Sequence, residues 1–218
     1  MFFHQHPYPP FIPHNADTLI VGTLPPPRFT TREIYMDDVD FCYGSKYGLL
    51  WPILERVYDV KLAYQNTNQA IQQRMNLLQR NRIGICDMVE SCQRLKIDAS
   101  DLGMHEIKLR NLIEVLNQNS TIDTILFMGG NSRNGPEYLF RKHLKSLGMK
   151  IQPIREKDPR IHELILHSRS IKCVSLISPS SAANRSIGSH SHYKKMKSLN
   201  KNYTTLDFRI EQYHQYFA

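Results

Sequence analysis

The chain has 218 residues, of which 41% are hydrophobic and 22% charged, with 10 glycines and 12 prolines, and this is typical of a globular protein rather than a collagen-like, disordered or membrane-spanning chain. Lysine and arginine number 28 against 20 acidic residues, so the formal net charge is +8. A basic excess of this size suits a phosphate-rich partner but also aids solubility, so charge alone does not identify a function.

Four short apolar runs without alternation predict buried parallel strands. In chain order these runs are Thr18–Gly22, Ile83–Cys86, Thr124–Met128 and Cys173–Ile177. Between them lie stretches of helical length and spacing, at Leu49–Tyr58, Thr67–Arg80, Lys108–Asn117 and Pro136–Leu147. The alternation predicts an α/β fold, a three-layer α/β/α sandwich with a central, mainly parallel four-stranded sheet.

The tail from His192 to Phe217 is expected to form one or two further helices. Its larger apolar and aromatic side chains are expected to pack on the sheet, and these are Tyr193, Met196, Phe208, Tyr213 and Tyr216. No repeat, low-complexity tract or linker interrupts the sequence. We therefore expect a single domain over residues 1–218.

The four cysteines, Cys42, Cys86, Cys92 and Cys173, are scattered without a C-x-x-C pair. This usage is typical of a reducing compartment and gives no support for a zinc site or an iron–sulfur cluster. Cys86 and Cys173 are expected in the core, whereas Cys42 stands beside two aromatic residues and could line a pocket. Prolines interrupt the first residues before any apolar run could span a bilayer, so we expect a cytoplasmic protein without a membrane partner.

Small and polar residues follow each predicted strand, where ligands bind in open parallel sheets. The four segments are Gly22–Pro27, Asp87–Ser91, Gly129–Gly135 and Ser178–Arg185. In order, the chain shows a strand ending in G-x-x-P, an aromatic segment leading to L-x-W-P-x-L, a strand ending IGICDMVESC and a strand ending SPSSAANR. This series, from about His6 to Met196, resembles the uracil-DNA glycosylase superfamily, with the nearest likeness to its mismatch-specific uracil/thymine and hypoxanthine-DNA glycosylase branches.

The resemblance implies an enzyme that extrudes a nucleotide, reads its base edge and hydrolyses the N-glycosidic bond through an oxocarbenium-like sugar. Gly22 would let the backbone approach the nucleotide, with Thr23 beside it in the first loop. Phe41 and Tyr43 would stack on the base, and Asn184 would contact it. The resemblance implies no cofactor and no metal.

Two positions where relatives carry a polar catalytic residue hold Leu24 and Gly48, which cannot position water. Asp40, favoured over its neighbours Asp37 and Asp38 because it adjoins Phe41, is one expected replacement. Asp87, directly after the second strand, is the other. Each has an alternative interpretation, since Asp40 could belong to a solvated or capping cluster and Asp87 could cap a turn.

The loop after the last strand matches the family segment that contacts the DNA strand. Its residues Ser178, Ser180 and Ser181 are expected to hydrogen-bond phosphates, although Ala182 and Ala183 stand where relatives often carry a bulky wedge. The expected phosphate-binding cations are Arg133, Arg185, Lys194 and Lys195. A lysine run is otherwise a solvated helix face, and the fragment Pro159–His162 is a chance likeness to a reactive histidine loop.

The sequence thus predicts a monomeric, monofunctional DNA glycosylase that removes uracil or another deaminated base from DNA. A catalytically impaired module that binds lesions or single strands is the alternative, supported by Leu24 and Gly48. A small-molecule nucleoside hydrolase is a third possibility, and such an enzyme would need no basic strip.

Overall fold

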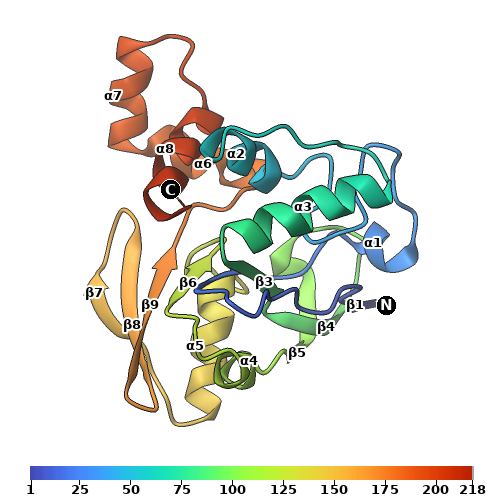
Figure 1. Ribbon diagram of the computed structural model, residues 1–218, viewed down its shortest axis with the longest axis vertical. Helices are drawn as coiled ribbons and strands as arrows, with labels where there is room; N and C mark the ends of the chain where they lie inside the picture. The colour runs from blue at the N-terminus through green and yellow to red at the C-terminus, as the bar shows by residue number, and fades with distance from the viewer. Residues whose placement is uncertain (218) are drawn as a thin grey trace.

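The computed structural model describes residues 1–217 and contains two β-sheets flanked by helices (Figure 1). The main sheet has six strands in the order β3-β2-β6-β9-β8-β7. Their bounds are β2 Thr18–Gly22, β3 Ile83–Asp87, β6 Thr124–Phe127, β7 Gln152–Arg155, β8 Arg160–Leu166 and β9 Arg169–Ser175. Strands β3, β2, β6 and β9 are parallel neighbours, as predicted from their apolar runs.

The predicted strand number of four was wrong, because β8 pairs antiparallel with β9 and β7 pairs antiparallel with β8. All four residues of β7 are exposed, and β8 buries only His162, Leu164 and Leu166, with partly buried or exposed residues before and between them. Neither strand has the continuous apolar run of a strand buried on both faces, so a sequence pattern of that kind does not reveal the edge of the sheet.

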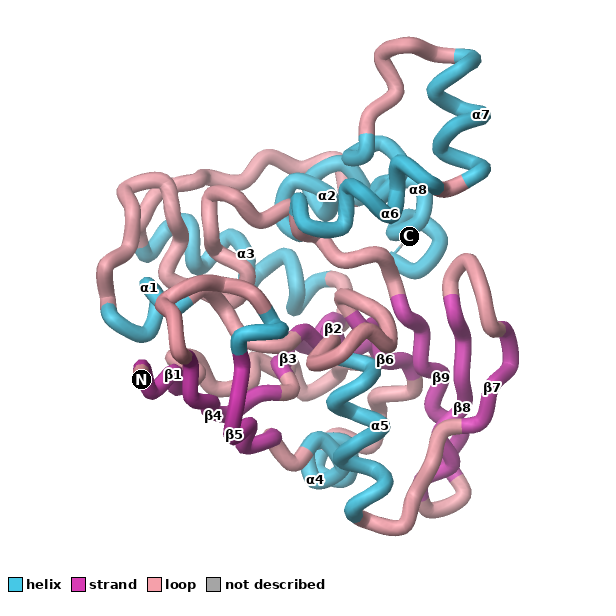
Figure 2. The backbone as a smooth tube through the Cα atoms, turned by 180° about the vertical axis from the view of Figure 1, so that it is seen from behind, coloured by secondary structure: helices cyan, strands magenta, loops and turns pink. Residues whose placement is uncertain are grey.

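A second sheet of three antiparallel strands lies beside the main one, in the order β1-β4-β5 (Figure 2). Its strands are β1 Phe2–Gln5, β4 Val89–Arg94 and β5 Met104–Leu109. The helix expected at Lys108–Asn117 was wrong at its start, because Lys108 and Leu109 end β5 and α4 covers Leu112–Gln118. The side chain of Asn111 caps α4 by accepting a hydrogen bond from the amide of Glu114, so the helix begins after it.

Helices cover both faces of the main sheet, which gives the three layers that the sequence predicted. On one face, Leu19 and Val21 of β2 pack toward α4, α5 (Pro136–Ser146) and the small sheet. On the other face, Ile20 packs toward α2 (Leu50–Val57), α3 (Asn68–Arg80) and α8 (Thr205–Phe217) (Figure 1). The short helix α1 (Pro27–Thr31) follows the loop after β2.

The C-terminal tail packs on the sheet only in part. Tyr213 joins the core cluster under α8, and Tyr216 lies against it. Phe208, Tyr193 and Met196 instead form a separate small cluster, because α6 (Asn184–Ser189) and α7 (Ser191–Leu199) supply Ile187 and their own apolar side chains. Helix α7 therefore stands away from the sheet (Figures 1 and 2). Within residues 1–217 no helix combines the length and the hydrophobicity needed to cross a bilayer.

Helix α8 holds the segment that follows β9. The guanidinium of the fully buried Arg209 donates to the carbonyl oxygens of Ser178 (2.9 Å) and Ser180 (2.7 Å). The Tyr213 hydroxyl donates to the Ile177 carbonyl at 2.8 Å, and the Gln212 side chain accepts from the Ile177 amide at 2.8 Å. These bonds satisfy backbone groups that have no partner strand, so the segment has a defined path.

Replacing Arg209 with leucine is expected to lower the free energy of unfolding by about 2 to 3 kcal/mol, because buried carbonyls lose a charged donor. Urea denaturation measures the change. Arg56→Leu on the exposed side of α2 is the control, expected to stay within about 0.5 kcal/mol of wild type. An Arg209 variant as stable as that control would show that α8 does not hold the segment.

Candidate functional site

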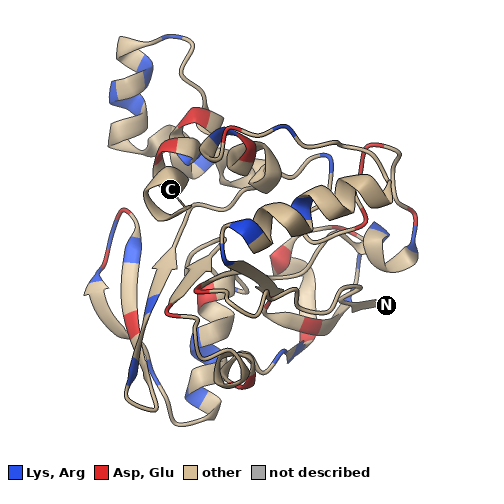
Figure 3. Ribbon diagram, in the orientation of Figure 1, with Lys and Arg blue, Asp and Glu red and all other residues tan. Residues whose placement is uncertain are grey.

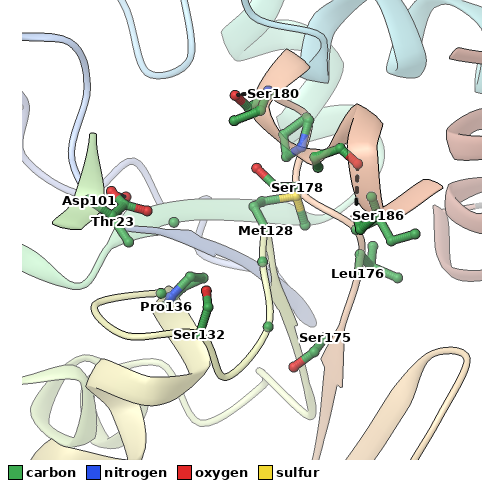
Figure 4. Close-up of a pocket in the computed structure, with 18 of the residues that line it drawn as sticks. Thr23, Asp101, Met128, Ser132, Pro136, Ser175, Leu176, Ser178, Ser180 and Ser186 are labelled. Atoms are coloured by element: carbon green, nitrogen blue, oxygen red, sulfur yellow. Dashed lines mark hydrogen bonds between the residues drawn. The ribbon is translucent and has the colours of Figure 1, made fainter. Parts of the chain in front are cut away.

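A cavity of about 1020 Å³ lies at the carboxyl ends of the parallel strands. Its walls are the segments that follow β2, β3, β6 and β9, together with residues 99–102 and the β7–β8 turn at residues 156–160. Figure 4 shows Thr23 and Asp101 on one side of it and Ser178 and Ser180 on another. The position agrees with the rule for open α/β sheets, and the volume is enough for a nucleotide-sized ligand.

Gly22 lies at the centre of the wall. Its amide donates to Asp87 Oδ1 at 3.1 Å. A Cβ at this position would lie 1.8 Å from the Tyr43 hydroxyl oxygen and 2.6 Å from Asp87 Oδ1, distances that atoms cannot adopt. The absence of a side chain at residue 22 therefore allows a phenol and a carboxylate to meet over the end of β2.

Asp87 lines the cavity and is 6% exposed. Its second oxygen, Oδ2, lies 2.9 Å from Nε2 of His6, which the segment after β1 supplies. Both carboxylate oxygens are thus held by residues that precede Asp87 in the chain. The alternative that Asp87 caps the turn that follows it is therefore wrong, because neither oxygen accepts from an amide of that turn.

A second carboxylate, which the sequence analysis missed, belongs to Asp101. Thr23 Oγ1 donates to Asp101 Oδ1 at 2.9 Å, and Oδ2 accepts no protein hydrogen bond within residues 1–217. Burial raises the pKa of Asp101 to about 6 and the charge of Asp87 adds to the rise, although the Thr23 hydrogen bond and Arg94 oppose it. Asp101 follows a strand of the small sheet, so no rule about main-sheet strand ends could have found it.

Asp40 and Phe41 do not line this cavity. Asp40 accepts hydrogen bonds from the Tyr8 hydroxyl at 2.7 Å and from Arg32 at 2.9 Å. Phe41 is buried against Phe11 and Trp51 in the core. The expectation that both meet the base is not met, because a tight turn over residues 39–44 sends alternate side chains in different directions.

Tyr43 does line the cavity, at the positive φ of 56° that this turn requires. Its ring and hydroxyl rest on Gly22, and burial raises its pKa well above the ordinary value, with the charge of Asp87 adding to the rise. The phenol is therefore neutral and available as a hydrogen-bond donor. Cys42 is buried and outside the cavity, which corrects the expectation that it could line a pocket.

Of the expected DNA-contacting residues, the cavity wall includes Arg133, Ser178, Ser180 and Ser181. The others lie outside it: Arg185 on α6, and Lys194 and Lys195 on α7. Asn184, which was expected to contact the base, begins α6 outside the cavity wall, so that expectation is not met. Figure 3 shows the Lys and Arg positions of α7 away from the sheet. The cavity itself thus receives fewer of the predicted cations than expected.

Other cations, not singled out from the sequence, line the cavity instead: Arg28, Lys157 and Arg160. Arg160 donates to the buried Glu137 at 2.5 Å, and Ser175 Oγ donates to the other Glu137 oxygen at 2.7 Å. Burial alone would raise the pKa of Glu137, but bonds from Arg141, Ser175 and Arg160 outweigh it and lower the pKa. Glu137 is therefore anionic and fixes Arg160 at the wall.

Leu24 and Gly48 both lie in the cavity wall, so the two positions without a polar side chain do face the site. No group of three or more His, Cys, Asp or Glu side chains in the described part of the chain is arranged to hold a metal ion. The polar chemistry of the cavity therefore rests mainly on Asp87, Asp101, Tyr43, the serines and the arginines.

The fold and the cavity define an α/β/α protein whose ligand site is formed by loops at the strand ends. A solution NMR structure of a candidate uracil DNA glycosylase from Methanosarcina acetivorans has a similar fold, with a TM-score of 0.54. The match covers 96% of this chain and 99% of that one at 17% sequence identity, a level that shows a shared fold alone. No protein-family model matches the sequence, and no curated protein matches it.

Gly22→Ala is expected to lower the free energy of unfolding by about 1 to 3 kcal/mol, because the added methyl group must displace Tyr43 or Asp87. Thermal or urea unfolding measures this change. The control is Gly130→Ala in the same cavity wall, where an added Cβ meets nothing within 4 Å. Equal stability of the two variants would contradict the close contact at Gly22.

Proposed function

We propose that the protein is a monofunctional DNA glycosylase of the uracil-DNA glycosylase superfamily. It hydrolyses the N-glycosidic bond of uracil or another deaminated base in DNA, acting as a monomer without a cofactor. The shared fold, the cavity at the strand ends and the sequence resemblance support this function together. The branches specific for mismatches and hypoxanthine are the nearest in sequence pattern.

The observation that carries the proposal is a pair of carboxylates held by successive residues of one loop. Gly22 binds Asp87 through its amide, and Thr23 binds Asp101 through its hydroxyl. Glycoside hydrolysis through an oxocarbenium-like sugar needs negative charge near the sugar and a group that activates water. Two carboxylates with different surroundings can divide these tasks.

Asp101 is the group that positions and activates the water. Its Oδ2 accepts no hydrogen bond from residues 1–217, and a pKa of about 6 leaves the carboxylate ionised at neutral pH yet basic enough to accept a proton. Asp87 has both oxygens occupied, so it acts as a fixed carboxylate beside the sugar and base. This division replaces the expected role of Asp40.

The remaining wall residues would bind the nucleotide. Tyr43 offers its ring and a neutral hydroxyl to the base, while Ser178, Ser180 and Ser181 offer hydroxyl groups to the sugar-phosphate strand. Arg133 and Arg160 supply positive charge for phosphates or for the departing anionic base. Asn184, Arg185, Lys194 and Lys195 would extend the contact to phosphates outside the cavity.

A lesion-binding module without catalysis is the second candidate. Leu24 and Gly48 line the cavity and offer no polar side chain at the usual catalytic positions. Cleavage assays on oligonucleotides that carry uracil, hypoxanthine, xanthine or mismatched thymine decide between the two. Alkaline scission at an abasic site supports the glycosylase, whereas binding without scission of any substrate supports the module.

Asp101→Asn is expected to lower the rate of base release at least 100-fold, because an amide cannot accept the proton of water. Wild-type activity should fall as the pH drops through about 6, where Asp101 becomes protonated. The residual activity of the variant should not show this decrease. The Asn oxygen still accepts from Thr23, so the fold is kept. Single-turnover rates at several pH values measure both effects.

The matched control is Asp98→Asn, which changes an exposed carboxylate in the same segment. It is expected to keep the wild-type rate and pH profile. Stability gives a second readout: because burial raises the pKa of Asp101, folding loses stability as pH rises from about 4 to 6, and Asp101→Asn removes that loss. An Asp101→Asn variant with the wild-type rate would exclude this residue as the base.

A further inference from the structure

An aromatic surface at the mouth of the cavity is not used by the chemistry described above. Tyr35 is 48% exposed and Tyr47 is 67% exposed, and their rings lie 6.5 Å apart at 84°. Large exposed aromatic pairs are uncommon on proteins unless they meet a ligand. We call the set Arg28, Tyr35, Lys46 and Tyr47 the tyrosine platform.

A buried carboxylate fixes the shape of the platform. Asp38 is fully buried and binds Arg28 through both oxygens, at 2.7 and 2.8 Å. It also accepts from the amides of Tyr35 at 3.0 Å and Lys46 at 2.8 Å. Burial alone would raise the pKa of Asp38, but Arg28 and the two amides outweigh it and lower the pKa. The Asp38 carboxylate therefore holds together the two segments that carry Tyr35 and Tyr47 in the absence of a ligand. This reduces the conformational entropy that is lost when a ligand binds.

Two cations lie next to the rings of the platform, and Asp38 neutralises one of them, Arg28, so Lys46 is the platform cation left to meet a phosphate. The Arg28 guanidinium carbon lies 4.8 Å from the centre of the Tyr35 ring, and Lys46 Nζ lies 4.9 Å from the same ring and 5.4 Å from the Tyr47 ring. Asp37 is 3.6 Å from Lys46 Nζ, but its side chain is 67% exposed and weakly held. Proteins that bind single-stranded nucleic acid combine aromatic rings, which stack on the bases, with cations, which contact the phosphates.

The platform is continuous with the cavity, because Arg28, Ser45 and Tyr47 belong to the cavity wall. The Ser45 hydroxyl accepts from Arg28 at 2.8 Å and from the Tyr47 amide at 3.2 Å, which ties the ring to that wall. A strand that placed one base in the cavity would pass an adjacent nucleotide over Tyr47. In a duplex, the neighbouring base pairs cover both faces of that adjacent base, so Tyr47 could not stack on it.

The segment after β9, in another part of the cavity wall, also favours a single-stranded ligand. Ala182 and Ala183 stand at the tip of the segment after β9, and their methyl groups are too small to fill the gap that a flipped base leaves in a duplex. Apart from the exposed Arg185 on α6, this segment offers no large side chain that could compensate extrusion from an intact double helix. A single strand needs no such wedge, because its bases are already unpaired.

We propose that the tyrosine platform binds an unpaired base adjacent to the excised one, so that the protein acts on single-stranded DNA in preference to duplex. The proposal rests on the proposed function for the base in the cavity. Binding to the platform, however, needs neither a lesion nor catalysis. The two proposals can therefore fail separately.

The test measures fluorescence anisotropy with a labelled oligothymidylate of about 15 nucleotides, free or annealed to its complement, on full-length protein. Wild type is expected to bind the single strand at least tenfold more tightly than the duplex. Tyr47→Ala should weaken single-strand binding about tenfold, as expected for loss of one stacked base, and leave duplex binding unchanged. Tyr47→Phe keeps the ring and should restore most of the affinity.

Phe3→Ala is the matched control, since it removes an exposed aromatic ring from β1 outside the cavity wall and should not change binding. Lys46→Gln should reduce the dependence of affinity on salt by about one phosphate contact. Equal binding of single strand and duplex, or full single-strand affinity in Tyr47→Ala, would overturn the platform. If the wild-type protein shows this binding pattern but releases no base from any substrate, the proposed glycosylase activity is wrong and the platform still stands.

Discussion

The pairing of β2 with β3, which ends where the Gly22 amide meets the Asp87 carboxylate, is the constraint on which the site depends. Beyond the last paired residues, the Met88 and Val89 amides donate to the Gly22 and Thr23 carbonyls, so the two strands stay together as they leave the sheet. The same two residues of the first loop hold both carboxylates, one through an amide and one through a hydroxyl. Tyr43 can rest on the end of β2 beside Asp87 only because residue 22 has no side chain.

The acidic residues at the cavity differ in whether they form an ion pair with an arginine. Asp38 and Glu137 are fully buried and each binds arginine directly, which keeps them anionic and fixes Arg28 and Arg160 at the wall. Within residues 1–217 Asp101 forms no ion pair with an arginine, and burial raises its pKa to about 6 although the charge of Arg94 opposes the rise. Buried acids thus place cations where a phosphate or an anionic base would lie, while the acid without such a partner keeps the proton affinity that general-base chemistry needs.

The C-terminal helix α8 supports the site by binding the backbone of one segment of the cavity wall. Arg209 and Tyr213 of α8 bind the backbone of residues 177–180 and give it a defined path without any strand pairing. The serine hydroxyls of that segment are left to face the cavity, because α8 takes the carbonyl oxygens. The lysines of α7 stand farther out, and further Lys and Arg positions lie on α3, α5 and β9, so the basic residues are spread over the molecule rather than gathered in one strip.

The sequence by itself determined the parallel strands, most helix positions and the location of the cavity, because continuous apolar runs and capping residues are local signals. It also placed Gly22, Thr23, Asp87 and the serines after β9 in the wall, since strand ends converge at one edge of a sheet, whereas Tyr43 was expected there from the family resemblance. Only the tertiary structure decided that Phe41 enters the core, that Asp40 binds Tyr8 and Arg32, and that Asp101 joins Asp87. Those outcomes depend on a tight turn and on a second sheet whose pairing joins residues far apart in the chain, and no local pattern records such contacts.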